Sequence, residues 1–297
     1  MSTLRELKGR IGSVASSEKI TGAMKMISSA KMHKAETALK KQLPYRRQIE
    51  TVIGNLLTAD APFSSPLIES REVRNIAVVV WGSDDGLCGA FNVNLFKQLL
   101  SRLNDLRSKY GEDVHVTLYP VGNKMKKAAA KIASDTLTVE IVEGIDSKTD
   151  GDDVKRFLVS LQSAFLEGKY DLVDMLYMHY KSVSRQVPVL EQLLPIDSSV
   201  FQKADGEVIQ CRPYIFEPDV TTIFSAILPL YMLSVMQEVF SENRASEQAA
   251  RVMAMQSAND NAKKLLEQLR LEYNKLRQQS ITTELLDILG GQVRYFY

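Results

Sequence analysis

Cysteine and histidine are scarce in this chain, and their scarcity excludes several kinds of site. The two cysteines among 297 residues, Cys88 and Cys211, are too few for a disulfide framework. The three histidines, His33, His115 and His179, form no i, i+4 pair and no HExxH motif, and no Cys/His spacing suits zinc. We therefore predict no metal site, and the low cysteine content fits a reducing cytosolic compartment.

A secretory leader is not expected either. The first residues, MSTLRELKGRIGSV, carry charges throughout and have no apolar core of the signal-peptide type. Residues 220–237 contain no charge, and this length is the lower limit for a membrane span. Pro229 and several hydroxyl and amide side chains oppose a span, because polar groups are costly in lipid. We interpret this stretch as the start of a helix buried in protein, with a membrane span as the alternative.

Acidic residues are rare at one end of the chain. Residues 1–47 hold 11 Lys/Arg against three Glu, a net charge of +8, whereas residues 48–240 hold 18 basic and 26 acidic residues. A basic helix suits an acidic protein surface, anionic lipid or nucleic acid, and charge alone does not choose among them. With 45% hydrophobic and 25% charged residues, the chain otherwise has an ordinary globular composition.

Both chain ends carry the apolar spacing of a long helix. From residue 2 to about 58 a narrow seam is formed by Leu4, Leu7, Ile11, Val14, Ile20, Met24 and Ile27. The glycines, serines and alanines between these positions lower helix propensity, so this helix needs a partner. We expect Pro44 to kink it and Ala61-Pro62 to end it.

A second helix is predicted from about Thr221 to Leu289, ended by Gly290-Gly291. Its apolar stripe consists of Phe240, Ala250, Met253, Leu265, Leu269, Tyr273, Leu276, Ile281 and Leu285. At 1.5 Å per residue the two helices would measure roughly 85 and 100 Å, far more than the width of a globular domain. Their seams are most simply buried against each other, which predicts a long antiparallel coiled coil formed by the N- and C-terminal helices.

An α/β pattern fills the middle of the chain. Strands are predicted at 76–81, 114–119, 137–142 and 172–180, and helices at 92–110, 124–133 and 154–167, with an edge strand or hairpin in 186–215. This alternation predicts a Rossmann-like, mostly parallel sheet with right-handed crossovers. We therefore expect an N-terminal coiled-coil helix at 1–60, a central α/β domain at 74–217 and a C-terminal helix at 218–297.

The loop that follows the first predicted strand, GSDDGLCGAFN (82–92), lies where such a sheet places ligands. Its glycines do not have the G-x-G-x-x-G spacing, and no G-K-[ST] sequence follows to hold phosphates. A tight turn with Cys88 as a small packed residue is the simpler interpretation, and nucleotide binding is the alternative. Asp84 and Asp85 lack neighbours that would complete a catalytic set, so we interpret them as turn and helix-start residues.

Three segments of the sequence resemble one known family. They are IGSVASSEKITGAMKMISSAKM (11–32), SDDGLCGAFN (83–92), and the C-terminal run of SENRAS (241–246), AMQSANDNA (254–262) and YNKLRQQSITTELLDILGG (273–291). The chain is similar there to the gamma subunits of F-type ATP synthases. Asp85 stands where that family usually has Arg, and the tail QVRYFY is longer and more aromatic than is common in the family. The chain lacks the cysteine-bearing insertion of chloroplast relatives and a transit peptide, which favours a bacterial setting.

The resemblance implies a noncatalytic rotor with no catalytic residue, cofactor or metal of its own. The implied partners are the ATP synthase alpha, beta and epsilon subunits and the membrane c-ring, with one copy of this chain per complex. Met24 and Lys25 match positions that face the lever loop of the beta subunit, and Arg277, Gln278, Thr282 and Glu284 match positions near its catch loop. The implied location is the cytoplasmic face of the bacterial membrane, as a peripheral protein.

Two other functions fit parts of the sequence. A nucleic-acid-binding or lipid-binding coiled coil would use the basic N-terminal helix, because phosphate neutralisation requires only clustered Lys and Arg. A nucleotide-dependent α/β enzyme with helical arms would bind its ligand at 82–92. The rotor interpretation predicts no nucleic-acid partner.

Overall fold

The computed structural model describes residues 3–57, 65–142, 144–146, 149, 151–197, 201 and 217–293. The chain divides into two compact units. One comprises Met1–Ser28 with Arg251–Tyr297, and the other comprises Ser29–Ala250. Each long terminal helix contributes to both units.

The two terminal helices, α1 (Leu4–Leu57) and α6 (Val220–Val293), follow the predicted ranges closely. The predicted stop at Gly290-Gly291 was wrong, because α6 continues through both glycines to Val293. Glycine disfavours a helix by about 1 kcal/mol but keeps its backbone N–H, so it does not forbid one. Pro44 lies inside α1, which ends at Leu57, and the predicted Ala61-Pro62 end falls outside the described residues.

The larger unit contains a five-stranded sheet of order β3-β2-β1-β4-β5. The strands are β1 (Asn75–Trp81), β2 (His115–Val121), β3 (Leu137–Val139), β4 (Leu172–Ser182) and β5 (Arg185–Leu194), and the helices between them are α2 (Phe91–Tyr110), α3 (Asn123–Ala129) and α4 (Gly151–Leu166). The pairs β1–β2, β1–β4 and β2–β3 are parallel, and β5 joins β4 as an antiparallel edge strand. The predicted mostly parallel α/β fold is therefore confirmed.

Two elements are shorter than predicted. The helix expected to reach residue 133 ends at Ala129, and the strand expected to reach residue 142 ends at Val139. After α3, the N–H of Lys131 and the N–H of Ile132 donate to carbonyls three residues earlier, which tightens the chain into a turn. β3 pairs with β2 over three residues only, from Leu137 to Val139.

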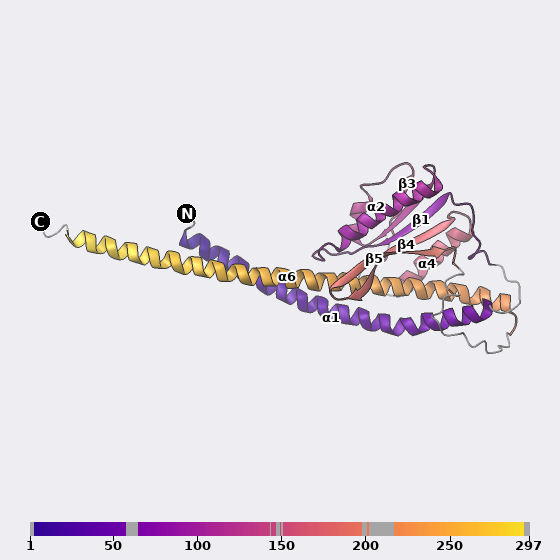
Figure 1. The fold of residues 1–297 in the computed structure, drawn as a ribbon, viewed down its shortest axis with the longest axis horizontal. Coiled ribbons are helices and arrows are strands. Elements are labelled where there is room, and N and C mark those ends of the chain that lie inside the picture. Colours follow the sequence, from indigo (N-terminus) through magenta and orange to yellow (C-terminus); the bar gives the residue numbers. More distant parts are fainter. Residues whose placement is uncertain are drawn as a thin grey trace. The chain divides into compact units, whose positions relative to one another are not determined.

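Both faces of the sheet are covered, as Figure 1 shows for α2 on one side and α4 on the other. Ile76, Val78 and Val80 of β1 pack into the cluster that contains α2 and α3. Ala77, Val79 and Trp81 alternate with them and pack into the cluster that contains α4, the end of α1 and the start of α6. Burial on both faces explains why this strand is a continuous apolar run.

The start of α6 has the length and composition of a membrane span. In the structure its apolar side chains lie in the core that covers the sheet, including Phe224, Leu228, Met232 and Val235. A buried core helix satisfies the same criteria of length and composition as a span. The interpretation of this stretch as a helix buried in protein is consistent with that packing.

Candidate functional site where the last helix meets the sheet

A polar stretch of α6 is buried against the strand ends. β1 pairs with β4 only as far as Val80 and Leu176. Beyond Leu176, the backbone groups on the β1 side of β4 therefore need other hydrogen-bond partners. Asn243 supplies one, because its Oδ1 accepts a hydrogen bond from the N–H of Met178 at 3.2 Å. Its Nδ2 donates to the Gly82 carbonyl at 3.3 Å, directly after β1. Asn243 thereby joins α6 to two strands.

Ser246 completes this contact one turn further along α6. Its Oγ donates to the carbonyl of Met178 at 2.8 Å, so both backbone groups of Met178 are satisfied by α6. Ser246 and Asn243 are 0% and 3% exposed. Buried polar groups of this kind fix the position of a helix, because breaking their hydrogen bonds leaves unpaired groups away from water.

The glycine-rich turn after β1 is held by its own side chains. Asn92 accepts a hydrogen bond from the N–H of Ser83 at 3.1 Å and donates to Ser83 Oγ at 2.7 Å. Ser83 Oγ donates in turn to the carbonyl of Asp85 at 2.9 Å. Cys88 is buried beside them, which confirms its interpretation as a small packed residue.

The same turn also anchors the start of α3. Asp84 Oδ1 accepts a hydrogen bond from the N–H of Asn123 at 3.1 Å, so it contacts the start of α3, 39 residues further along the chain. The helix that directly follows the turn, α2, has Ala90 at its N-cap and no side-chain cap. The N–H of Gly82 donates to the Val121 carbonyl, and that of Ser83 donates to Asn92. A phosphate cradle would need such N–H groups for its ligand. These two are used within the protein, which gives the nucleotide alternative no support.

Asp85, the departure from the family pattern, lines a groove of about 460 Å³. Three basic residues line the same groove, namely Lys31 and Lys34 of α1 and Arg244 of α6. Glu247 of α6 lines it as well, and the two acidic residues offset part of the mutual repulsion of the three basic ones. The positive charge near Asp85 therefore comes from residues of α1 and α6 and not from the turn that follows β1.

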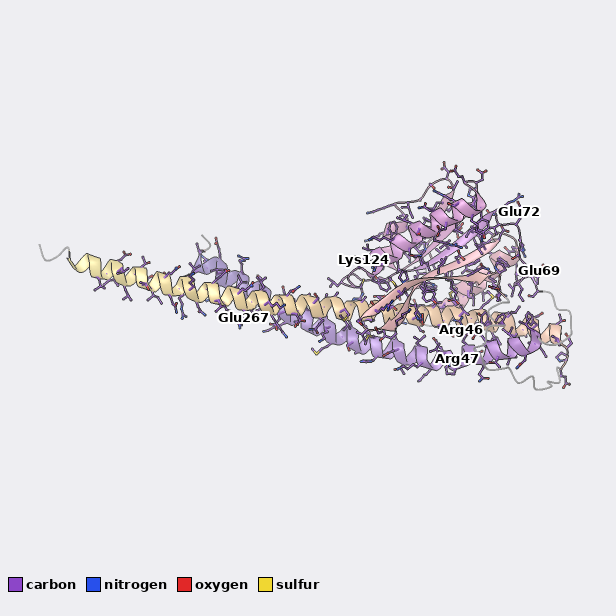
Figure 2. The ribbon with its side chains drawn as sticks, in the orientation of Figure 1. Arg46, Arg47, Glu69, Glu72, Lys124 and Glu267 are labelled. Carbon is purple, nitrogen blue, oxygen red and sulfur yellow. The ribbon has the colours of Figure 1, made fainter. Side chains whose placement is uncertain are left out.

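Arg46 of α1 forms three ion pairs with three parts of the larger unit. Its Nε contacts Glu50 at 2.8 Å, its Nη1 contacts Glu238 of α6 at 2.9 Å, and its Nη2 contacts Glu191 of β5 at 3.2 Å. The Arg46 side chain is only 18% exposed. Figure 2 labels it beside Arg47 on α1, a residue whose side chain is exposed.

Burial and neighbouring charges both shift the pKa values in this cluster. Burial lowers the pKa of Arg46, but Glu238 and Glu191 outweigh that effect and raise the pKa above its usual value. Burial raises the pKa of Tyr231, which lies under the Arg46 guanidinium, to about 12. Burial, followed by the charge of Glu191, likewise raises the pKa of Tyr177, whose hydroxyl donates to Glu191. Arg46 is therefore held as a permanent cation.

A second polar contact joins β4 to α6. His179 Nδ1 lies 2.7 Å from Glu242 Oε2, and the Glu242 side chain is only 7% exposed. Burial raises the pKa of Glu242, His179 lowers it, and the nearby Glu238 and Glu191 raise it again, so the net direction is upward. Among the residues that the structure describes, no group of three or more His, Cys, Asp or Glu is arranged to hold a metal ion.

The residues that we predicted to contact partners all lie in the smaller unit. Met24 and Lys25 of α1 are half-buried. The α6 residues Arg277, Gln278, Thr282 and Glu284 are exposed. The structure brings two of them together, since Thr282 Oγ1 donates to the Gln278 carbonyl at 2.9 Å, and both line a groove of about 520 Å³. Their roles as partner contacts stay a prediction.

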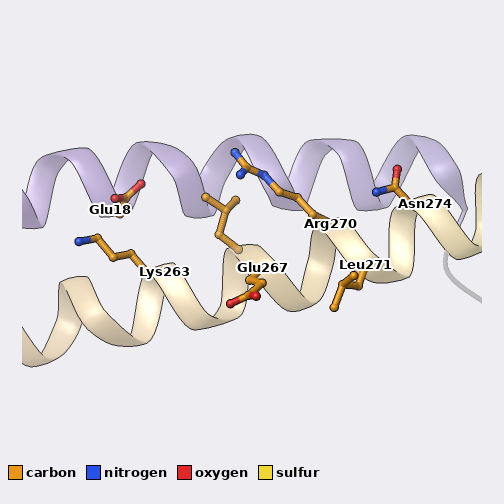
Figure 3. Close-up of a pocket in the computed structure, with 7 residues that line it drawn as sticks. Glu18, Lys263, Glu267, Arg270, Leu271 and Asn274 are labelled. Atoms are coloured by element: carbon orange, nitrogen blue, oxygen red, sulfur yellow. The ribbon is translucent and has the colours of Figure 1, made fainter.

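In this smaller unit α1 and α6 run side by side, as the close-up in Figure 3 shows. A groove of about 540 Å³ between them is lined by Glu18 of α1 and, on α6, Lys263, Leu266, Glu267, Arg270, Leu271 and Asn274. One turn before this groove, Asn259 of α6 donates a hydrogen bond to the Glu18 carbonyl at 2.6 Å. The contact between α1 and α6 therefore includes the buried side-chain amide of Asn259.

Sequence reasoning missed Arg46, Asn243 and Asn259. Asn243 and Asn259 lie within the motifs 241–246 and 254–262, which carried the family resemblance without a stated role. A polar residue at a position of the apolar helical period is the signal that could have identified them. Arg46 left no comparable signal, because its partners lie at positions 191 and 238.

The chain matches known proteins along almost its whole length. Residues 3–293 match the family model described as ATP synthase. The ATP synthase gamma chain of Phocaeicola vulgatus is 41% identical over 297 residues, which cover 99% of this chain and 100% of that protein. The ATP synthase gamma chain of Bacteroides fragilis is 39% identical over 293 residues, with the same coverage of 99% and 100%.

A solved structure shares the fold. It is the Euglena gracilis mitochondrial ATP synthase, OSCP/F1/c-ring, in rotational state 3, in which one chain aligns with a TM-score of 0.66 at 22% identity. The alignment covers 98% of this chain and 93% of that one. The match of the family model over residues 3–293, together with relatives more than a third identical over their full length, shows that this chain belongs to the ATP synthase gamma chain family.

Proposed function

We propose that this chain is the noncatalytic central-stalk rotor of an F-type ATP synthase and transmits torque between an ion-driven c-ring and the catalytic alpha and beta subunits. The observation that carries the proposal is the family match over residues 3–293, which includes both long helices and the sheet. In this account the helices of 1–60 and 218–297 form one antiparallel coiled coil, and 74–217 forms the domain that docks on epsilon and the c-ring at the cytoplasmic face of the membrane. ATP chemistry belongs to the partner subunits.

The burial pattern of the smaller unit supports a paired-helix shaft. The predicted seams were wrong in part, because Ile20, Ile27, Met253 and Leu265 are 59%, 57%, 44% and 41% exposed. On α1 the less exposed positions include 4, 7, 11, 14, 18, 21, 25 and 28, and on α6 they include 252, 255, 259, 262, 266, 269, 273, 276 and 280. Both series alternate steps of three and four residues, which is the heptad spacing of a coiled coil. A seam of this kind gives torsional stiffness to a long helix pair.

The last turns of α6 support the presence of surrounding partners. Five large apolar side chains there are 49% to 63% exposed, namely Ile281, Leu285, Leu286, Ile288 and Leu289. A water-exposed apolar group of this size marks a surface that another chain covers. Ile281, Leu285, Ile288 and Leu289 have the i, i+4, i+7, i+8 spacing of one helix face, and Leu286 borders that face, so they form one apolar stripe that suits a partner surface at the end of α6.

Catalytic beta subunits would respond to this shaft through differential contacts. Each orientation of an asymmetric shaft stabilises a different state of the beta subunit it touches, which changes nucleotide affinity by a coupling free energy. Met24, Lys25, Arg277, Gln278, Thr282 and Glu284 are the contacts that we propose. The +8 charge of residues 1–47 suits an acidic neighbour.

Co-purification tests the assembly. The native chain, tagged and isolated from its own membranes, is expected to bring alpha and beta subunits in a ratio of one to three of each. Recovery of the chain with neither subunit would overturn the proposal. Nucleic acid recovered in place of these subunits would support the basic coiled-coil alternative.

Charge reversal tests the proposed contact. Lys25→Glu is expected to reduce ATP-driven proton pumping in reconstituted vesicles while the far-UV circular dichroism of the chain stays unchanged. Lys97→Glu is a matched control, because Lys97 lies exposed on α2 outside the proposed contacts. Equal pumping and turnover in both variants would remove Lys25 from the contact set.

A further inference from the structure

Asn259 occupies a position in the helix seam that apolar residues occupy on either side. It is 9% exposed, and the neighbouring seam residues Met255 and Leu266 are 5% and 7% exposed. Its Nδ2 donates to the Glu18 carbonyl at 2.6 Å and lies 3.2 Å from Thr21 Oγ1. Burying an amide in a seam is unfavourable unless such partners are present.

The partners of Asn259 belong to the matching seam on α1. Glu18 and Thr21 are successive positions of its heptad series, preceded there by Ile11 and Val14. The helices approach closely at this level, since a Cβ placed on Gly22 would lie 3.4 Å from Asn259 Nδ2. The three residues therefore form a polar layer, with Ile11 and Val14 next to it on one side of the α1 seam and Lys25 and Ser28 on the other.

We infer that Asn259, bonded to the Glu18 carbonyl and Thr21, is a positioning residue that fixes the axial register of α1 against α6. If the pair is antiparallel, a one-heptad shift in one direction would place Asn259 against Ile11 and Val14, whose side chains offer no acceptor in place of Thr21 Oγ1. A shift in the other direction would place Leu266 against Glu18 and Thr21. A single buried asparagine specifies register in coiled coils for the same reason.

The register has a consequence for coupling. A shift of one heptad moves one helix by about 10 Å along the other. The same shift would change the axial distance between Lys25 of α1 and Arg277 of α6, two of the proposed partner contacts, by that amount. This inference rests on the helix pairing in the proposed function, and it adds the residue that sets the alignment of that pair.

Spin labels on the full chain measure the register directly. Both natural cysteines are replaced by serine, and labels are attached at Met26→Cys and Leu265→Cys, two positions that are 69% and 41% exposed. The parent is expected to give one narrow distance distribution by double electron–electron resonance. Asn259→Leu is expected to add a second population displaced by up to about 10 Å, with helix content unchanged.

Two further variants keep the test specific. Asn259→Asp has the same shape but no N–H donor when ionised, so it is also expected to broaden the distribution. Asn261→Leu alters an exposed asparagine two residues away and is expected to leave the distribution unchanged. In the reconstituted complex, Asn259→Leu is expected to pump fewer protons per ATP hydrolysed than Asn261→Leu.

The outcomes separate the inference from the proposed function. A single distribution at the parent distance in both Asn259→Leu and Asn259→Asp would overturn the register role while the helix pairing stands. A broad distribution in the parent itself would overturn the pairing, and the register role with it. A second population in Asn259→Leu alone, or in both variants, supports the inference.

Discussion

Arg46 of α1 and Glu238 of α6 form an ion pair of 2.9 Å, with side chains that are 18% and 12% exposed. The same guanidinium also contacts Glu191 of β5 at 3.2 Å, so one side chain connects both long helices to the edge of the sheet. These contacts all lie within the larger unit. In a shaft that transmits torque, such a connection would resist rotation of the helices against the domain.

Removal of Arg46 is expected to destabilise the larger unit. Arg46→Ala leaves Glu191 and Glu238 as carboxylates without their cation in a largely buried place, which typically costs about 3 kcal/mol. Arg47→Ala changes an exposed neighbour and is expected to alter stability by less than about 0.5 kcal/mol. Urea unfolding of both variants measures the difference, and equal losses would show that the three ion pairs contribute nothing specific.

The buried carboxyl of Glu242 gives stability a pH dependence. Its pKa is raised above the ordinary 4.5, mainly by burial, while His179 of β4 lowers it and Glu238 and Glu191 raise it. A carboxyl with a raised folded pKa has no effect on stability below its ordinary pKa. It destabilises the fold as the pH rises through the folded pKa, because a buried group must then lose its proton.

Glu242→Gln removes this titration and can still accept a hydrogen bond from His179. The unfolding free energy of the variant, relative to the parent, is therefore expected to rise as the pH increases from about 4 to about 7. Glu267→Gln, at an exposed site on α6, is the control and is expected to show no such trend. A constant difference between Glu242→Gln and the parent over this range would contradict the prediction.

The strands could be predicted because their burial leaves a local pattern. Residues 76–81 are apolar without interruption, and each side of this strand packs into a separate core. The end of α6 could not be predicted as well, since Gly290-Gly291 is typical of a helix stop yet forms part of the helix. Propensity is a weak prior at helix ends, where one glycine changes the free energy by only about 1 kcal/mol.

The contacts of the candidate site join residues that are far apart in the chain, so no local sequence pattern predicts them. Asn243 has its role because β1 stops pairing with β4 at Val80 and Leu176, so Met178 needs a partner from elsewhere. The ion pairs of Arg46 join positions 46, 191 and 238, which only the folded topology brings together. The contact of Asp84 with the N–H of Asn123 is of the same kind, since it joins positions 39 residues apart.

Truncation of Asn243 is expected to weaken the attachment of α6 to the sheet. Asn243→Ala removes the acceptor of the Met178 N–H and the donor to the Gly82 carbonyl, both buried, at a cost of about 2 kcal/mol. Hydrogen exchange at the Met178 amide is expected to accelerate. Asn104→Ala, on the exposed side of α2, is expected to leave that exchange rate unchanged.

Gly82, directly after β1, has no room for a side chain. A Cβ at this position would lie 2.5 Å from the Cβ of Met125, which is fully buried, and 3.1 Å from the carbonyl oxygen of Val121. Neither atom can rotate away, because one is backbone and the other is fixed to it. Gly82→Ala is therefore expected to cost about 2 kcal/mol through displacement of the turn.

Two comparisons test the cause of that loss. Gly12→Ala lies on α1 with nothing within 4 Å of the new Cβ, and it is expected to raise stability by up to about 1 kcal/mol through helix propensity. Gly82→Ala combined with Met125→Ala is not expected to recover stability, since alanine keeps the Cβ that clashes. Recovery in this double variant, measured by urea unfolding, would show that the flexible end of Met125 causes the strain instead.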